Sequence, residues 1–201
     1  MLTFDIECIP DTRMTEEDRQ RFLKRADTSG KDLDAYLSLC APTAQIVAVG
    51  IKHDEEIAVS MCSDNEKEII SSLLLNIEES DRVLTFNGRC YDFPVLLARA
   101  AAHGIKVPRD VVKIAYEYRF KPNLHIDISD MMTLFGAGSK APLEAYCVTY
   151  GIPNPKEVSS GGDVLTLYRA GEYDKIAAYV KADVEATYAV YSRWMRFVGW
   201  N

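Results

Sequence analysis

The sequence predicts an α/β fold with a mixed central β-sheet of about five strands flanked by helices. Short runs rich in β-branched residues, at positions 2–8, 46–52 and 82–86, have the length and composition of strands. Longer stretches between and after them carry apolar residues every three or four positions, as on one face of a helix. Strands that alternate with helices in this way favour a single sheet with helices on its faces.

Length and composition favour one domain over residues 1–201, with the 48% hydrophobic and 26% charged residues typical of a soluble globular protein. No apolar run approaches the roughly 18 residues that span a bilayer, so we expect no membrane contact. Five cysteines, an odd number without C-x-x-C spacing, indicate a reducing cytoplasm. A net charge of −7 argues against a protein that coats duplex nucleic acid, but not against one that grips a few nucleotides.

The first third of the chain predicts three antiparallel strands and two helices. Residues 46–52 and 56–62 are strand-like runs joined by His53-Asp54-Glu55, which is a hairpin signal. Residues 12–41 are polar, with apolar positions at helical spacing on both sides of the break Thr28-Ser29-Gly30. We interpret residues 12–41 as a helical insertion that lies over the first strand.

The remainder of the chain predicts crossovers between helices and strands. An amphipathic helix after residue 64 leads to the strand at residues 82–86, which should return parallel to the first strand. Asn87-Gly88 ends that strand, and a helix is expected at residues 91–103. The other expected elements are a short strand at residues 124–128, helices near residues 142–150 and 163–169, a loop at residues 151–162 and a final helix at residues 173–197.

The first strand carries two acids among apolar residues. Because side chains alternate along a strand, Asp5 and Glu7 share one face, opposite Phe4, Ile6 and Cys8. Neighbouring carboxylates repel each other and lose solvation unless they face water or a cation. The pair by itself therefore fits either an edge strand with a solvated acidic face or a metal site.

Two more acids stand at positions suited to chemistry. Asp92 opens a helix just beyond a strand end, where the helix dipole favours a carboxylate and where open α/β sheets place their sites. Tyr179 and Asp183 are four residues apart and so lie on one side of the last helix. Taken singly, Asp92 could be a helix-capping acid, Tyr179 an ordinary half-buried aromatic residue and Asp183 a solvated acid.

Together these acids resemble, in order and spacing, the three motifs of the DEDD (DnaQ-like) 3'-5' exonucleases. The motifs are Asp5-x-Glu7, Asn87-Gly88 with Asp92, and Tyr179-x-x-x-Asp183. The tyrosine resembles the DEDDy branch, because the histidine branch would have His where this chain has Ala178. The chain is also similar to stand-alone proteins related to the exonuclease domain of family B DNA polymerases. The resemblance implies an RNase H-like fold.

The resemblance further implies that Asp5, Glu7, Asp92 and Asp183 hold two Mg²⁺ or Mn²⁺ ions. Hard cations of this kind prefer oxygen ligands, and a pair of them can stabilise both the attacking and the leaving oxygen of an in-line displacement. Tyr179, with a reference pKa near 10, is a poor base at neutral pH. We expect its hydroxyl to orient a water molecule instead.

The candidate substrate contacts are Asn87, Phe93, Asp127 and Lys156. Asn87 could hydrogen-bond near a terminal nucleotide, and Phe93 or Tyr91 could stack on a splayed base. Asp127 is a candidate auxiliary acid, and Lys156 could reach a phosphate. The alternatives are turn and core residues, with His125 as a structural histidine. Residues 99–121, the one basic region, could contact a phosphate backbone or form a solvated surface.

We therefore expect a metal-dependent 3'-5' exonuclease that hydrolyses single-stranded DNA or frayed 3' ends to nucleoside 5'-monophosphates, with repair or end trimming as a hypothetical role. An exoribonuclease or oligonucleotide nuclease of the same chemistry stays open, because no residue identifies a reader of the RNA 2'-hydroxyl. A non-catalytic nucleic-acid-binding module is the alternative from another class, and the complete set of acids argues against it.

Overall fold

A computed structural model describes residues 1–158 and 164–199. Within them, five strands form one mixed sheet in the order β3-β2-β1-β4-β5. Its strands are β1 (Leu2–Pro10), β2 (Ala44–His53), β3 (Val59–Cys62), β4 (Val83–Thr85) and β5 (His125–Asp127). β1 pairs antiparallel with β2 and parallel with β4, so the predicted mixed sheet and the parallel return of its fourth strand are confirmed.

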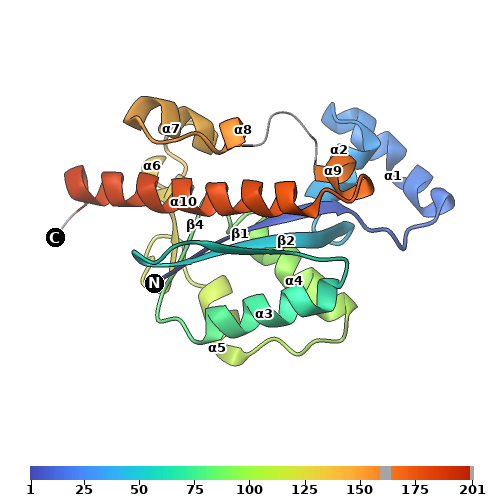
Figure 1. Ribbon diagram of the computed structural model, residues 1–201, viewed down its shortest axis with the longest axis horizontal. Helices are drawn as coiled ribbons and strands as arrows, with labels where there is room; N and C mark the ends of the chain where they lie inside the picture. Colours follow the sequence, from blue (N-terminus) through green and yellow to red (C-terminus); the bar gives the residue numbers. More distant parts are fainter. Residues whose placement is uncertain (159–163, 200–201) are drawn as a thin grey trace.

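Helices cover both faces of the sheet (Figure 1). One face packs against α3 (Glu66–Glu78), α4 (Asp92–Ala102) and α5 (Arg109–Ala115), and α10 (Tyr173–Phe197) crosses the other. Phe4 and Ile6 belong to the core on the α3–α4 side, together with Ile69 and Leu73. The alternation of β1 therefore places Asp5 and Glu7 on the opposite face, as predicted, and in the structure α10 covers that face.

The short β4 strand leaves most of β1 without a parallel neighbour. β4 pairs only with Leu2 and Thr3, so the edge of β1 beyond Thr3 is open on that side. The turn at Asn87-Gly88 then leads into α4, whose first residue, Asp92, accepts a hydrogen bond from the Ile6 backbone N–H at 3.3 Å. A helix terminus thus takes the place that a longer β4 would have occupied.

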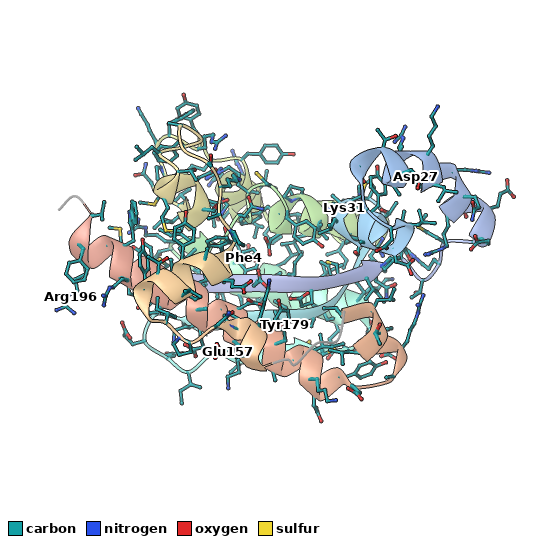
Figure 2. All side chains as sticks on the ribbon, turned by 90° about the horizontal axis from the view of Figure 1, so that it is seen from above. Phe4, Asp27, Lys31, Glu157, Tyr179 and Arg196 are labelled. Atoms are coloured by element: carbon teal, nitrogen blue, oxygen red, sulfur yellow. The ribbon has the colours of Figure 1, made fainter. Side chains whose placement is uncertain are left out.

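Two helices lie between β1 and β2, as the spacing in residues 12–41 predicts. They are α1 (Glu16–Ser29) and α2 (Leu33–Leu39), and Gly30 between them has a left-handed φ of 70°. Figure 2 shows Asp27 and Lys31 on this pair, which projects away from the sheet. The Tyr91 hydroxyl donates a 2.7 Å hydrogen bond to the Ser38 carbonyl and so ties α2 to the start of α4.

The remaining elements are α6 (Ile128–Met132), α7 (Leu143–Tyr150), α8 (Pro155–Val158) and α9 (Val164–Arg169). α8 corrects the predicted loop at residues 151–162, whose last four residues, like residue 163 of the next predicted helix, lie outside the described residues. The final helix has the predicted bounds. All five cysteines are free. No helix within the described residues combines the length and the apolarity that crossing a bilayer requires.

Candidate active site

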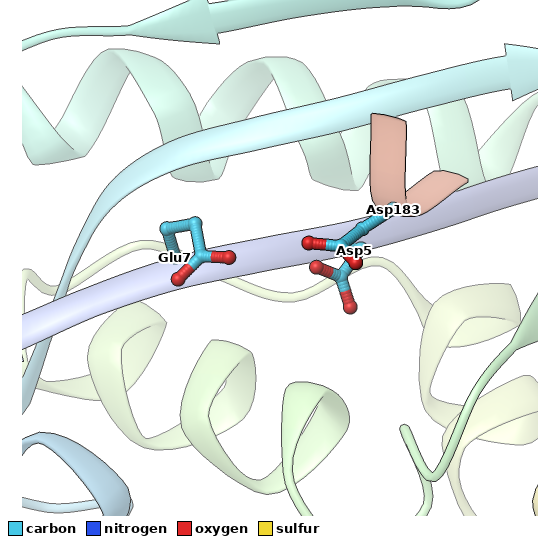
Figure 3. A group of neighbouring side chains, drawn as sticks. All are labelled: Asp5, Glu7 and Asp183. Carbon is cyan, nitrogen blue, oxygen red and sulfur yellow. The ribbon is translucent and has the colours of Figure 1, made fainter. Parts of the chain in front are cut away.

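Three carboxylates from opposite ends of the chain meet beside the central strand. Asp5 and Glu7 extend from β1 toward α10, and Asp183 extends from α10 toward them (Figure 3). One carboxylate oxygen of each lies within 4.8 Å of the others. The spacing of two along a strand and the crossing of α10 over that strand are sufficient to bring these acids together.

Gly50 lets α10 come this close. It is the residue of β2 that pairs with Asp5, and a Cβ at this position would lie 2.6 Å from the Val180 carbonyl oxygen and 2.6 Å from a methyl of Val184. No real Cβ makes such contacts, so a side chain here would push α10 away from β1. A glycine inside a β-branched strand is the signal that could have identified this position from the sequence.

The acids line a cleft of about 790 Å³. Its lining includes Asp5, Glu7, Asp92, Tyr179, Asp183 and Asn87, together with Asp32 and Ser38 of the α1–α2 pair. Asp92 shares the cleft but not the group of three, and one of its oxygens is engaged by the Ile6 backbone N–H. Figure 2 shows Tyr179 beside β1.

Burial and mutual repulsion disfavour ionisation of this cluster. Burial raises the pKa of Asp5, and the charges of Asp92, Asp183 and Glu7 raise it further. The pKa of Glu7 is raised by burial and then by Asp183 and Asp92. Burial likewise raises the pKa of Asp92 to about 7, against the lowering effect of backbone N–H groups.

Asp183 and Tyr179 interact through a hydrogen bond on α10. Burial raises the pKa of Asp183 to about 7, while the Lys156 charge and the Tyr179 hydroxyl partly oppose this rise. Burial, followed by the charges of Asp183, Glu7 and Asp5, raises the pKa of Tyr179 well above its usual value. Tyr179 is therefore a neutral phenol at any physiological pH, as expected for a group that orients water rather than removing a proton.

The donor set fits hard divalent cations. Asp5, Glu7 and Asp183 offer clustered carboxylate oxygens, which are the ligands that Mg²⁺ and Mn²⁺ prefer. No lysine, arginine or histidine within residues 1–158 and 164–199 forms an ion pair with any of the three. Carboxylates held together without a cationic partner are stabilised by a bound cation.

Two of the expected substrate contacts are corrected by the structure. Phe93 is only 2% exposed and packs edge-on against Phe4, with ring centroids 5.4 Å apart, so it cannot stack on a base. Tyr91, the other candidate, lines the cleft. Asp127 is also only 2% exposed, and its carboxylate accepts the backbone N–H groups of Asn87 at 2.9 Å and Arg89 at 3.0 Å. It shapes the turn that leads to Asp92 and is not available to a substrate.

The other two candidate substrate contacts, Asn87 and Lys156, lie near the acids. Asn87 lines the cleft with a left-handed φ of 64°, a conformation that asparagine tolerates in turns. Lys156 is exposed and pairs with Glu144 at 2.6 Å, and its charge reaches Asp183. His125 is fully buried and bonded to Thr85, and burial lowers its pKa to about 3, so it is a neutral structural residue.

The predicted basic region is not one surface. Arg99 is 1% exposed and lies between Asp11 and Glu66, at 2.6 Å from each. This buried ion network was not visible in the sequence, because its members come from the segment after β1, from α3 and from α4. Arg99 therefore belongs to the packing of α4 rather than to a substrate surface.

The chain is similar to known proteins over most of its length. Residues 36–200 match a family model described as a predicted 3'-5' exonuclease related to the exonuclease domain of PolB. A DNA polymerase of Methanocaldococcus jannaschii is 28% identical over 135 residues, which are 63% of this chain and 8% of the polymerase. Asp92, Tyr179 and Asp183 lie inside the family match, whereas Asp5 and Glu7 precede it.

The fold has a counterpart among solved structures. The family B DNA polymerase of the hyperthermophilic archaeon Pyrobaculum calidifontis superposes with a TM-score of 0.67 at 15% identity, over 98% of this chain and 24% of that one. This likeness confirms the expected RNase H-like fold. The chain spans only a small part of both polymerases. By its match over most of its length, the chain belongs to the family of predicted 3'-5' exonucleases related to the exonuclease domain of PolB.

Proposed function

We propose that the protein is a metal-dependent 3'-5' exonuclease that hydrolyses single-stranded DNA or frayed 3' ends to nucleoside 5'-monophosphates. The convergence of Asp5, Glu7 and Asp183 within 4.8 Å, without an ion-pair partner among the described residues, carries this proposal. The size of the cleft supports action at an end, because about 790 Å³ accommodates a small-molecule-sized group rather than a duplex. A cellular role in DNA repair or end trimming is consistent with this activity.

The acids would hold the metal ions, and Tyr179 would position the water. Asp5 would contact both cations, Glu7 and Asp183 would hold the one on the nucleophile side, and Asp92 would help to hold the other. Two Mg²⁺ or Mn²⁺ ions bound there would supply Lewis-acid stabilisation of the attacking and leaving oxygens. Tyr179, a neutral phenol within hydrogen-bonding reach of Asp183, orients the attacking water. The tie between Tyr91 and Ser38 holds α2 as a wall of the cleft.

Product analysis tests the proposal. A single-stranded DNA oligomer labelled at its 5' end should be shortened stepwise from its 3' end in Mn²⁺ or Mg²⁺, with release of nucleoside 5'-monophosphates and no reaction in EDTA. The Asp5→Asn variant should be inactive, and Asp81→Asn, which alters an exposed aspartate, should be as active as the parent. Internal cleavage, or activity retained in Asp5→Asn, would contradict the proposal.

Two further measurements separate the alternatives. An RNA oligomer of the same sequence, assayed in parallel, distinguishes a deoxyribonuclease from an exoribonuclease. Calorimetric titration of the parent and of Asp5→Asn with Mn²⁺ distinguishes an enzyme from a binding module. If the protein is an enzyme, the parent should bind the metal tightly and Asp5→Asn should not. Equal metal binding by the parent and Asp5→Asn would remove the basis of the enzyme assignment.

A further inference from the structure

Aromatic side chains gather on the surface where two loops meet. Tyr118 and Phe120, in the connection after α5, are 64% and 51% exposed. The Phe120 ring lies 5.3 Å from that of Tyr118 and 5.4 Å from that of Phe135, in the segment after α6. We call Tyr118, Phe120 and Phe135 the aromatic ledge. Tyr118 and Phe120 are exposed and Phe135 is half-buried. Exposed rings in contact with one another are unusual on a surface without a partner, because their burial would be favourable.

The backbone presents one of these rings at an energetic cost. Phe135 has a φ of 57°, and Leu134 before it has a φ of 49°. Left-handed backbone is unfavourable for bulky side chains. Leu134 is 68% exposed, so burial of its own side chain does not offset this cost, and Phe135 is half-buried. Such strain at an exposed position is typical of a segment that serves binding.

Positive charges surround the ledge. The Arg119 guanidinium lies 5.6 Å from the centre of the Phe120 ring. Arg89, Arg119 and Lys140 all lie within 4.0 Å of the buried Asp130 carboxylate, at 3.5, 2.6 and 3.9 Å. The Arg119 and Lys140 side chains are 37% and 43% exposed, whereas the Arg89 side chain is only 14% exposed. These two exposed cations suit the phosphates of a nucleic acid.

The ledge is continuous with the acid cleft. The Lys140 ammonium donates a 2.6 Å hydrogen bond to the Asn87 side-chain oxygen, and Asn87 lines the cleft with Asp5 and Asp92. The opposite wall, on α2, presents Asp32, which would repel a phosphate. A strand whose end lies among the acids is therefore favoured to leave past Asn87 and Lys140.

We propose that the aromatic ledge, with Lys140 and Arg119, binds the single-stranded segment of the substrate that leads out of the cleft, an inference that rests on the nuclease function proposed above. Bases stack on the rings of Tyr118, Phe120 and Phe135, and phosphates lie near the two cations. Stacking of this kind is tolerant of sequence, because every base has an aromatic face. The enzyme therefore prefers strands long enough to reach the ledge over the shortest oligonucleotides.

Binding without cleavage tests this inference independently of catalysis. On the Asp5→Asn background in EDTA, fluorescence anisotropy would measure the affinity for a labelled oligothymidylate of about twelve nucleotides and for one of about three. Phe120→Ala or Tyr118→Ala should weaken binding of the longer strand at least about fivefold and leave the shorter one nearly unchanged. Lys140→Gln should flatten the dependence of log affinity on log salt concentration by about 0.7.

Phe197 provides a matched control. It is 66% exposed, and the guanidinium groups of Arg193 and Arg196 lie 5.2 and 5.3 Å from its ring centre. Phe197→Ala should bind both strands as the Asp5→Asn parent does. Circular dichroism would verify that each variant is folded.

The outcomes separate this inference from the proposed function. Equal affinity of the parent for long and short strands, or unchanged affinity in both aromatic variants, would overturn the inference, and the ledge would then be a candidate surface for a protein partner. Ledge-dependent binding by a protein without nuclease activity would contradict the proposed function alone. An active nuclease whose affinity for the longer strand is unchanged by the ledge substitutions would contradict this inference alone.

Discussion

Two acidic clusters lie along the same strand in opposite electrostatic environments. Asp5 and Glu7, in the middle of β1, face Asp183 and have no ion-pair partner among the described residues. Asp11, directly after β1, shares the guanidinium of Arg99 with Glu66, at 2.6 Å each. Asp5, Glu7 and Asp183 are half-buried and line the cleft, whereas Asp11, Glu66 and Arg99 are buried.

The pKa values move in opposite directions in the two clusters. In the cleft, burial and mutual repulsion raise the pKa of Asp5, Glu7 and Asp183. Burial would also raise the pKa of Asp11, but hydrogen bonds from Arg13 and Arg99 outweigh it and hold that pKa well below its usual range. A buried acid that is paired stabilises the fold, whereas acids gathered without a cation destabilise it until one binds.

The largest effect is expected from removing one acid of the cleft. Asp5→Asn should lower the nuclease rate at least about 1000-fold, because it removes a carboxylate that would contact both ions. The same change should leave the free energy of unfolding in EDTA unchanged or raise it, since it relieves repulsion. Steady-state assays and urea titration would measure the two effects, and a strongly destabilised variant would show that Asp5 is a structural acid.

We call Asp11, Glu66 and Arg99 the paired cluster. Removing its cation should destabilise the fold. Arg99→Met should lower the free energy of unfolding by about 3–5 kcal/mol, because it leaves Asp11 and Glu66 buried without their shared cation. Arg13→Met is the matched control. Its side chain is 54% exposed and pairs with the same Asp11, so it should cost less than about 1 kcal/mol. Equal losses in the two variants would contradict the distinction between the clusters.

Gly50 lies beside the cleft acids, and its lack of a side chain lets α10 pack close to the sheet there. Gly50→Ala should cost about 1–3 kcal/mol of stability by overpacking against Val180 and Val184. It should also lower kcat roughly tenfold, since small displacements of catalytic groups are costly. Gly138→Ala, whose added methyl would find its nearest heavy atom at 3.6 Å, should change neither quantity. Full activity in Gly50→Ala would show that the position of α10 tolerates displacement.

Stability in EDTA should also depend on pH. Asp92 and Asp183 have an ordinary pKa of 3.8 in the unfolded chain and of about 7 in the folded protein. Between these values the folded protein binds more protons than the unfolded chain, so their contribution to stability falls as the pH rises from about 4 to about 7. We expect the urea midpoint to fall over this window, and less so in Asp5→Asn or with Mn²⁺.

The pH dependence of stability that Asp11 contributes has the opposite sign. The pKa of Asp11 is depressed by folding, so its contribution is present above its ordinary pKa of 3.8 and is lost as the pH falls below it. Acidification below pH 3.8 should therefore lower the urea midpoint less in Arg99→Met than in the parent. An equal fall in the two proteins would contradict this assignment.

Most of the fold could be predicted from the sequence, because local periodicity carries it. The alternation in β1 fixes which residues share the face of Asp5 and Glu7, and the apolar positions of α10 determine which side of the helix packs on the sheet. Turn residues such as Asn87 and Gly30 mark the ends of elements correctly. The errors fell on short elements, such as α8, where periodicity is too brief to separate helix from loop.

The sequence by itself determined the identity of the acids, and only the tertiary structure decided what each buried polar residue contacts. Phe93 faces the core rather than the cleft, Asp127 is occupied by backbone N–H groups, and Arg99 neutralises acids from two other segments. Such contacts depend on how separate elements pack, and spacing along one element contains no information about the partner that faces it.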